Sequence, residues 1–398
     1  MTVLTGTLGV EDVLQNKQVR DVSKGLYHKY LDLNPLTALL MKMPKGRTAY
    51  NPKVYWHRQD LLPRWDVISA VTTASGATVV FTPTTVDRFK LGDVVEIPQL
   101  SPGATETNIG VVTTLATTVT LTAVGWQSNL AATASTFPTI TGGMNAHIIN
   151  DSSEEYSQKP AMKVNKVAEE WNHIHFSRVP YVIGNIEEEV KQYTGDERPS
   201  RRTETYKDIR IQTEENMFHG ERYYRDGTNG RQFFARGFRR FIQQGAGVNI
   251  LDWSSGLTES NFDEFLQKGC CKAGIGSSVR FGFFSDNLCL RLNEIGKAKQ
   301  RIVEGGTTVL GMHFNTYVAP NGTRLHYRDH HLMVEDYENA GLIIDPTRAR
   351  IRPYGTQGVM RLLTDIQEND RAGVADEWQI IYSLEIDRIE PMAWIDKG

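Results

Sequence analysis

Residues 50–70, YNPKVYWHRQDLLPRWDVISA, decide how the rest of this chain is interpreted. The stretch has no helical period and contains a proline, so an extended ribbon is expected. Trp56 and Trp65 lie on this ribbon among charged residues, which are Lys53, Arg58, Asp60 and Arg64. Large aromatic side chains usually lie in a core or an interface, so the ribbon raises the question of what covers its tryptophans.

The composition is that of a globular protein that is not specialised for nucleic acid. The chain has 398 residues, enough for two or three domains, of which 40% are hydrophobic and 23% charged. It has 44 Lys and Arg against 47 Asp and Glu, and the net charge of −3 argues against a dedicated nucleic-acid binder, although local basic clusters are compatible with it. No apolar run is long enough to span a membrane, and residues 1–17 lack the features of a secretory signal. We therefore expect no membrane partner.

The sequence contains no recognisable active site or metal site. His173 and His175 lie two apart on an expected strand, which could place both imidazoles on one metal, but no third ligand is evident nearby. Cys270, Cys271 and Cys289 lack metal-ligand spacing and fit buried thiols in a reducing compartment. A Walker loop, a His-Glu-x-x-His motif and a nucleophile elbow are absent from the sequence. We expect a protein that is not an enzyme and that has no catalytic residues, cofactor or metal.

Two helical segments precede the ribbon. Residues 19–30 carry apolar side chains at helical spacing, although Gly25 weakens the pattern. Residues 33–43, LNPLTALLMKM, give a stronger signal, because Asn34 can cap a helix and Pro35 suits its first position. Its apolar side consists of Leu36, Leu39, Leu40 and Met43. The helix should end at residues 44–46, and the two segments together predict an N-terminal arm.

The composition changes abruptly after the ribbon. Residues 67–86 and 107–150 contain no Asp, Glu, Lys or Arg. Short β-branched runs bounded by turn residues recur there: ATVVFTP, GDVVEIP, IGVVTTL and TVTLTAV. We predict a small antiparallel β-barrel or sandwich over residues 69–150, with a disordered Thr-rich linker as the alternative. Aromatic residues with a buried character favour folding: Phe81, Phe89 and Trp126.

A second extended segment follows at residues 164–178, where alternation predicts strand. The two ribbons then form one long hairpin with a domain inserted at its tip. A helix should follow, capped by Ser200 and free of Gly until Gly220. Its apolar side is thin and consists of Tyr206, Ile209, Thr213 and Met217. A long polar helix of this kind lies on a surface or contacts several neighbours.

The remaining sequence predicts a compact α+β body from about Arg231 onward. Helices are expected at residues 257–274, capped by Thr258, and at residues 285–306. Strands are expected at residues 278–285, on both sides of an Asn321-Gly322 turn, at residues 341–346 and at residues 377–395. Charged residues on the last strand indicate an edge strand or a sheet packed on one face only: Asp387, Arg388 and Glu390.

The strongest electrostatic feature is a basic cluster in residues 231–241, RQFFARGFRRF. It comprises Arg231, Arg236, Arg239 and Arg240, and four phenylalanines alternate with these arginines. The cluster could contact nucleic acid. Alternatively, the phenylalanines pack inward while the arginines meet solvent or the carboxylates of a neighbour, and this second interpretation is favoured.

Taken in order, these segments resemble the major capsid protein of tailed bacteriophages, whose fold is named for phage Hong Kong 97. The likeness is carried by residues 34–63, NPLTALLMKMPKGRTAYNPKVYWHRQDLLP, by residues 172–185, NHIHFSRVPYVIGN, and by the charged helix from Arg201 to Tyr224. The resemblance implies an α+β fold with an N-terminal arm, an extended loop, a spine helix, a peripheral domain and an axial domain. The chain departs from the plainest members at residues 69–150, where a small all-β domain interrupts the loop.

The resemblance and the order of elements imply a set of boundaries. They are residues 1–45 for the arm, 46–68 and 151–184 for the extended loop, 69–150 for the inserted domain, 185–251 for the spine helix and part of the peripheral domain, 252–324 for the axial domain, and 325–398 for axial-to-peripheral strands and the C-terminal segment. The peripheral domain would take residues 228–250 and the strands from Gly341 to the end.

The resemblance also implies a structural subunit that self-assembles into hexamers and pentamers of an icosahedral capsid around packaged double-stranded DNA. An extended loop cannot bury tryptophans within its own subunit, but it can bury them against the adjacent one, where aromatic residues and Arg dominate binding energy. The expected intersubunit contacts are Trp56, Arg58, Asp60, Trp65, Trp171, Arg201, Arg202, Tyr206 and Ile209.

The implied partners are other copies of the chain, portal and scaffolding proteins, cement or minor capsid proteins, and the packaged DNA, which is contacted non-specifically. A nearly neutral subunit suits a shell that encloses DNA without binding it strongly. The implied location is the capsid of the virion, after assembly in the host bacterial cytoplasm. The inserted domain would face outward as a decoration or as a clamp on a neighbour. Because the sequence starts at Met1, we expect no cleaved N-terminal scaffolding segment.

Two other functions compete with this interpretation. A bacterial nanocompartment shell, of the encapsulin kind, shares the fold and encloses enzymes, but such shells usually lack a large loop insertion. An enzyme with a β-rich accessory domain is the second alternative, and its activity would depend on a single His or carboxylate.

Overall fold

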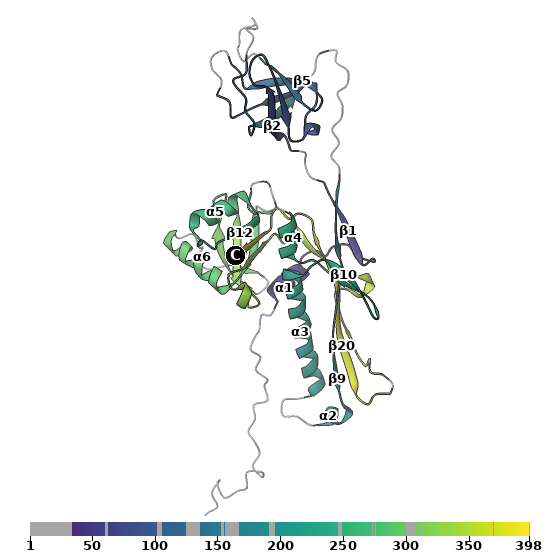
Figure 1. Cartoon of the computed structure of the whole chain (residues 1–398). Coiled ribbons are helices and arrows are strands. Elements are labelled where there is room, and N and C mark those ends of the chain that lie inside the picture. Colours follow the sequence, from purple (N-terminus) through teal and green to yellow (C-terminus); the bar gives the residue numbers. More distant parts are fainter. Residues whose placement is uncertain are drawn as a thin grey trace, which may run out of the picture. The chain divides into compact units, whose positions relative to one another are not determined.

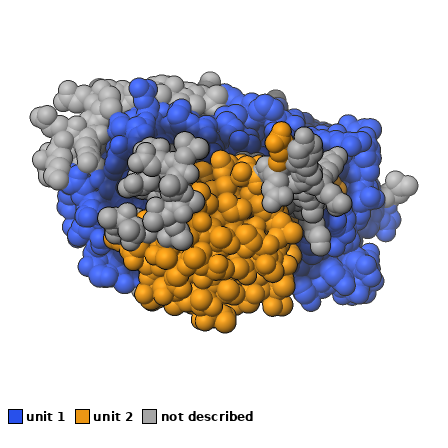
Figure 2. All heavy atoms as spheres, turned by 90° about the horizontal axis from the view of Figure 1, so that it is seen from above, with its two compact units in different colours: residues 1–56, 169–398 blue, residues 57–168 orange. Residues whose placement is uncertain are grey.

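The structure is a computed structural model that describes residues 34–59, 63–101, 106–124, 136–152, 155, 167–190, 196–245, 249–272, 274, 276–299, 307–309, 312–368 and 370–397. The chain divides into two compact units (Figure 2). The first, called the main unit, comprises residues 1–56 and 169–398, and the second comprises residues 57–168. The helix expected at residues 19–30, Asp60 and Trp126 lie outside the described residues.

The second unit is a closed barrel of six antiparallel strands in the order β2-β3-β6-β5-β4-β7. The strands are β2 (Trp65–Thr73), β3 (Thr78–Pro83), β4 (Asp93–Glu96), β5 (Ile109–Leu115), β6 (Val119–Ala123) and β7 (Asn145–Asp151). Alternate residues point inward and form an apolar core around Phe81 and Leu121, both 0% exposed. Closure pairs every strand on both sides, so the barrel leaves no open sheet edge.

The ribbon consists of two paired strands, β1 (Lys53–Arg58) and β8 (Ala168–His173). The chain turns at Ile174, whose N–H donates to the carbonyl of Pro52 at 2.9 Å, and continues as β9 (His175–Ile183). A short helix, α2 (Asn185–Glu189), ends this segment.

Two helices pack against each other, and the longer of them also packs on β9 (Figure 1). The first, α1 (Pro35–Lys42), has the expected start and end, with Asn34 at its N-cap position and Pro35 first. The second, α3 (Glu197–His219), begins earlier than expected and has Asp196 at its N-cap. The assignment of Ser200 as the cap is wrong, because a proline is tolerated in the first helical turn and Pro199 lies there.

A four-stranded sheet lies next to α3 (Figure 1). Its long strand β20 (Val374–Ile386) pairs with β9, β18 (Ala349–Pro353) and β19 (Met360–Leu363). Ile209 and Met217 of α3 enter one apolar cluster with Ile380, Tyr382 and Leu384 of β20. The thin apolar side of α3 is therefore core.

A seven-stranded mixed sheet forms the rest of the body, in the order β12-β21-β17-β13-β16-β15-β14. The strands are β12 (Ile250–Asp252), β13 (Val279–Phe284), β14 (Thr307–Val309), β15 (Met312–Val318), β16 (Arg324–Asp329), β17 (Gly341–Ile344) and β21 (Ala393–Asp396). Side chains at alternating strand positions point to opposite faces and join two apolar clusters. One cluster includes residues of α5 (Glu259–Lys268) and α6 (Asp286–Lys299), and the other includes residues of α4 (Phe238–Gly245). The sheet is thus buried on both faces.

One expectation about the C-terminal strands is wrong. Asp387, Arg388 and Glu390 lie in the connection between β20 and β21, so they do not mark an edge strand. The strands from Gly341 to the end are divided between two sheets, because β17 and β21 belong to the seven-stranded sheet and β18 to β20 to the four-stranded one.

The remaining described elements are short. A two-stranded hairpin, β10 (Tyr223–Gly227) and β11 (Gly230–Phe234), follows α3, and single 3-10 turns lie at Val86–Arg88, Glu335–Tyr337 and Gly355–Gln357. Among the described helices, none combines the length and the apolar character that a bilayer crossing requires.

Candidate functional site

The ribbon strand β1 turns one tryptophan into the core of its own chain. Val54 and Trp56 point inward along β1, whereas Tyr55 is exposed. Trp56 is 7% exposed, and its ring centroid lies 6.2 Å from that of Phe241 in α4. The expectation that a neighbouring subunit covers Trp56 is wrong, because α4 packs beside the ribbon and supplies a cover that is distant in the sequence.

Trp171, on the ribbon strand β8, contacts two cations of its own chain. Lys53 Nζ lies 3.8 Å from the centroid of the indole, and the guanidinium carbon of Arg222 lies 3.7 Å from it. Arg222 also donates to the carbonyl of Trp171 at 2.6 Å, and burial lowers the pKa of this guanidinium. Such cation–π contacts hold the base of the ribbon to the segment after α3.

The remaining ribbon residues lie nearer the barrel. Trp65 begins β2, is 44% exposed and stacks on His147, with 6.2 Å between the ring centroids. Arg58 is half-buried at the end of β1. Trp65 is therefore the most exposed of the three tryptophans expected at a subunit contact.

A buried asparagine, which the sequence analysis missed, fixes the bend between β8 and β9. The amide of Asn172 donates to the carbonyls of Arg236 at 3.2 Å and Leu384 at 2.9 Å, and its oxygen accepts from the N–H groups of His173 and Arg236. This arrangement separates His173 from His175, which packs on Tyr382. Burial lowers the pKa of His175 to about 4, and among the described residues no cluster suited to a metal ion occurs.

Glu214 of α3 is a second buried polar residue that the sequence analysis missed. It is 0% exposed, and its carboxyl oxygens accept from the N–H groups of Leu36 at 2.8 Å and Thr37 at 2.7 Å, at the N-terminus of α1. The Thr37 hydroxyl and His330 Nε2, the latter at 2.9 Å, also bond to it. Glu214 thus caps a helix that lies far away in the sequence and joins it to the seven-stranded sheet.

Arg202 contacts a carboxylate of its own chain, Asp376 of β20, which is 0% exposed. Arg198 and Arg202 approach its oxygens to 2.7 and 2.9 Å, the Asp365 N–H donates at 3.0 Å, and the Tyr181 hydroxyl also bonds to it. Burial alone would raise the pKa of Asp376, but the hydrogen bonds from Arg198, Tyr181, Asp365 and Arg202 together hold it well below its usual range.

The other expected contacts on α3 differ in exposure. Ile209 is 0% exposed, so its assignment to a subunit contact is wrong: it faces the four-stranded sheet. The ring of Tyr206 packs on Trp378 with 5.0 Å between the ring centroids. Arg201 is exposed and pairs with Glu197 and Glu204 on its own helix, at 2.7 and 2.9 Å.

The basic cluster does not form one surface. Arg236 is 6% exposed, so its assignment to a DNA-facing surface is wrong: its guanidinium lies 5.2 Å from the ring of Phe241. Arg239 pairs with Asp396 at 3.3 Å, Arg240 with Glu221 at 2.9 Å, and Arg231 with Asp226 at 2.8 Å. Phe238 and Phe241 are buried, as the packing interpretation requires.

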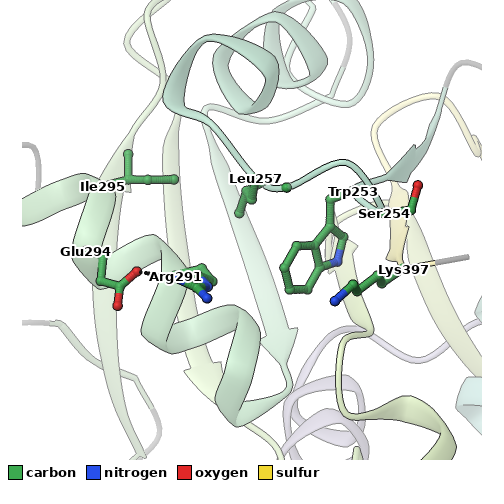
Figure 3. Close-up of a pocket in the computed structure, with 8 residues that line it drawn as sticks. Trp253, Ser254, Leu257, Arg291, Glu294, Ile295 and Lys397 are labelled. Carbon is green, nitrogen blue, oxygen red and sulfur yellow. Dashed lines mark hydrogen bonds and ion pairs between the residues drawn. The ribbon is translucent and has the colours of Figure 1, made fainter.

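Two recesses lie on the described surface of the main unit. One, of about 330 Å³, lies between α6 and the end of the chain, where Leu257, the ion pair of Arg291 with Glu294, and Lys397 surround Trp253 (Figure 3). The other, of about 360 Å³, lies between β9 and α3 and is called the acidic groove. Its lining is Tyr181, Val182, Ile183, Glu187, Glu197, Arg201, Glu204, Thr205 and Asp208.

Several solved structures match this chain at low sequence identity. The structure of Mycobacterium phage Bobi has 7% identity over 99% of both chains, with a TM-score of 0.48. The capsid of a native GTA particle has 7% identity over 98% of this chain and 97% of that chain, also with a TM-score of 0.48. The SrpI encapsulin of Synechococcus elongatus has 10% identity over 58% of this chain and 77% of that chain, with a TM-score of 0.42. No curated protein matches the chain.

The family comparison covers nearly the whole chain. A family model described as SU10 major capsid protein matches residues 5–384, which include the ribbon, the barrel, α3 and all strands of the two sheets except β21 and the end of β20. This match confirms the expected α+β capsid fold and the expected structural role. The chain therefore belongs to the SU10 major capsid protein family and is a structural subunit of an icosahedral capsid.

Proposed function

We propose that copies of this chain assemble into hexamers and pentamers of a closed shell that encloses packaged double-stranded DNA. The ribbon carries this proposal, because β1 and β8 form a sheet of only two strands. Such a sheet is marginally stable alone, and side chains near it or continuing from it stay exposed, namely Tyr50 at 70%, Tyr55 at 44% and Phe176 at 47%. Identical neighbours in a symmetric ring would cover these groups.

The residues that we propose at subunit contacts differ from those expected from the sequence. Tyr55 replaces Trp56 as the outward aromatic residue of β1, because alternate residues of a strand point to opposite faces. Arg58, Trp65 and Arg201 remain in the proposed contact set. Trp171 and Arg202 act within the chain, where they position the ribbon and α3 for those contacts.

The two sheets of the main unit take different places in the proposed shell. The seven-stranded sheet with α5 and α6 is the axial domain, nearest the axis of each hexamer or pentamer. The four-stranded sheet with the spine helix α3 is the peripheral domain. The chain runs from the peripheral domain to the axial one and returns through β18 to β20.

The proposed partners beyond identical copies are portal and scaffolding proteins, cement or minor capsid proteins, and the packaged DNA. Contact with DNA is weak and non-specific, since the exposed arginines of the predicted basic cluster, Arg231 and Arg240, are already paired with carboxylates. Assembly takes place in the host bacterial cytoplasm.

The barrel is proposed to decorate the shell or to clamp a neighbour. Replacing residues 69–150 with a short linker separates these roles. A clamp predicts that shells without the barrel dissociate at a lower temperature than complete shells. Shells that form and resist heat unchanged would leave only decoration.

Electron microscopy of the purified chain tests the proposed assembly. Hexamers, pentamers or closed icosahedral particles, with symmetry resolved by class averages, are the expected result. A chain that stays a monomer at high concentration, with or without a scaffolding protein, would contradict it. Cargo peptides that copurify with the particle in place of DNA would identify a nanocompartment.

A further inference from the structure

We propose that the outer face of the β10–β11 hairpin on one copy docks in the acidic groove of a second copy. The outer face is defined by Tyr223, Arg225, Gln232 and Phe234. This inference rests on the proposed self-assembly and adds one contact to it, which joins two different surfaces of neighbouring subunits.

The hairpin has two faces that the strand register separates. Tyr224 pairs with Phe233 and Asp226 with Arg231, so these four side chains share the inner face. That face packs on its own chain: Phe233 packs against Val54 and Ile174, and His173 lies 5.4 Å from Phe233 and 6.0 Å from Tyr224, measured between ring centroids. In Figure 1, the hairpin accordingly lies where the ribbon meets β9, and β11 is its strand that packs there.

The outer face joins none of the apolar clusters that the described residues form. Tyr223 pairs with Phe234 and Arg225 with Gln232 across the two strands. Tyr223 is 60% exposed and its ring lies 6.3 Å from that of Phe234, while Arg225 donates to Gln232 at 2.6 Å. This face therefore combines two aromatic rings with one positive charge and contains no carboxylate. A hairpin of two strands is marginally stable alone, so a cover on this face would stabilise it.

The acidic groove offers the complementary chemistry. Four of its lining residues are carboxylates, Glu187, Glu197, Glu204 and Asp208, and one, Arg201, is a cation. Arg201 is shared by Glu197 and Glu204, whereas Glu187 and Asp208 are exposed. The apolar part of the lining includes Val182, which is 70% exposed, and Ile186 of the adjacent α2 is 86% exposed. An aromatic and basic face matches a groove with this pairing of apolar and acidic side chains.

A single copy cannot make this contact with itself. The groove extends along the first half of α3, from Glu197 to Asp208, and the hairpin follows the end of this helix. The 11 residue steps from Asp208 to His219 alone span roughly 17 Å at 1.5 Å per residue. In the proposed ring the contact is heterologous: each copy gives its hairpin to one neighbour and its groove to the next, and such contacts close into a ring where the rotation between copies closes.

A charge exchange tests the contact in the full-length chain. We compare Arg225→Asp, Asp208→Arg, the double variant and the wild type for shell formation at low and high salt. Each single variant places like charges together, and we expect its shell yield to fall by more than about tenfold at low salt. The double variant restores opposite charges at every contact, so its yield should return to within about twofold of the wild type.

Mixing the two single variants gives a second readout. In a ring of alternating variants each altered hairpin meets an altered groove, and each native hairpin meets a native groove. Six-membered rings should therefore form from an equal mixture, whereas five-membered rings retain one mismatched contact. Circular dichroism and thermal melting of each variant before mixing show that the subunits are folded.

Arg231→Gln and Arg225→Gln form the matched control pair, because the two arginines lie on opposite faces of one hairpin. Only Arg225→Gln should reduce shell yield. Two results would overturn the docking contact, provided that wild-type shells still form. One is a shell yield of Arg225→Asp equal to that of the wild type. The other is a reduced yield of Arg225→Asp that the added Asp208→Arg does not restore. Failure of the wild type to assemble under any condition would instead overturn the proposed function.

Discussion

The inserted barrel and the main unit differ in what lies at their centres. The barrel core is apolar, and its buried carboxylates, Asp66 and Asp93, bond backbone N–H groups of nearby turns. The main unit instead buries ionisable side chains that bond residues far away in the sequence: Glu214, Arg280, Asp345 and Asp376.

This difference shows how two parts of one chain acquire stability. Apolar burial is non-directional, so the barrel needs only the right alternation of side chains and closure of its strands. A buried carboxyl group is costly unless several donors surround it, so each one in the main unit fixes the relative position of three or more segments. The barrel therefore buries its apolar side chains by itself. In the main unit, the buried polar residues fix the positions of the segments around a ribbon whose outer side chains stay exposed.

The largest expected effect is on the barrel core. Phe81→Ala removes a ring that is 0% exposed, which should lower the free energy of unfolding of the barrel by about 4 kcal/mol. Hydrogen exchange should accelerate in β3 and β6 and stay unchanged in α3 if the barrel unfolds by itself. Thr114→Ala, on an exposed position of β5, is the control. Equal acceleration in α3 would mean that the two units unfold together.

Glu214→Ala should have the next largest effect, because it leaves two N–H groups of α1 and one of the His330 ring nitrogens without their acceptor. We expect a loss of about 3 kcal/mol in the free energy of unfolding of the main unit, measured by denaturant titration. Amide exchange at Leu36 and Thr37 should accelerate most. The neighbouring Glu215 is exposed, so Glu215→Ala should change neither quantity, and equal effects of the two variants would contradict the capping role.

Asp376→Asn should cost about 2 kcal/mol at pH 7, because it removes a charge that Arg198 and Arg202 both contact. The pKa of this carboxyl group is lowered on folding, so its contribution is fully present above the unfolded pKa of about 3.9 and is lost as the pH falls below that value. The difference between wild type and variant, measured by urea unfolding, should thus shrink between pH 5 and pH 2.

Asp370→Asn, at an exposed position, serves as the control for that pH series. A difference between wild type and Asp376→Asn that stays constant over the whole range would mean that the carboxylate does not titrate with folding.

The smallest effect is expected for Arg201→Ala, whose ion pairs with Glu197 and Glu204 lie on the surface. The free energy of unfolding of the subunit should stay within the measurement error of the wild type, because water screens exposed pairs. A loss of unfolding free energy as large as that of Asp376→Asn would mean that exposed ion pairs stabilise this chain as much as buried ones.

Local signals account for the parts of the fold that the sequence predicted well. Asn34 and Pro35 mark the start of α1, and the Thr258 hydroxyl accepts from the Asn261 N–H at 3.3 Å at the start of α5. The Asn321-Gly322 turn joins β15 and β16, with Gly322 at a φ of +83°, a conformation that glycine adopts without strain.

The residues that were misassigned or missed depend on segments distant in the sequence. Trp56 is covered by Phe241, and the N–H groups that bond Glu214 belong to residues 177 and 178 positions away. Asn172 bonds a carbonyl that is 212 positions away. No local pattern distinguishes such a buried Glu or Asn from a solvated one, because its burial is decided by tertiary packing. The acidic groove was missed for the same reason, since its two sides come from β9 and α3.

The first and last strands of the barrel are neighbours, with Trp65 opposite His147 and the Ile148 N–H bonded to the carbonyl of Arg64 at 2.7 Å. Where a module begins and ends side by side, the host chain requires of it only a fixed spacing between two adjacent ends. A foreign domain with neighbouring termini should therefore be accepted between residues 64 and 152 in place of the barrel.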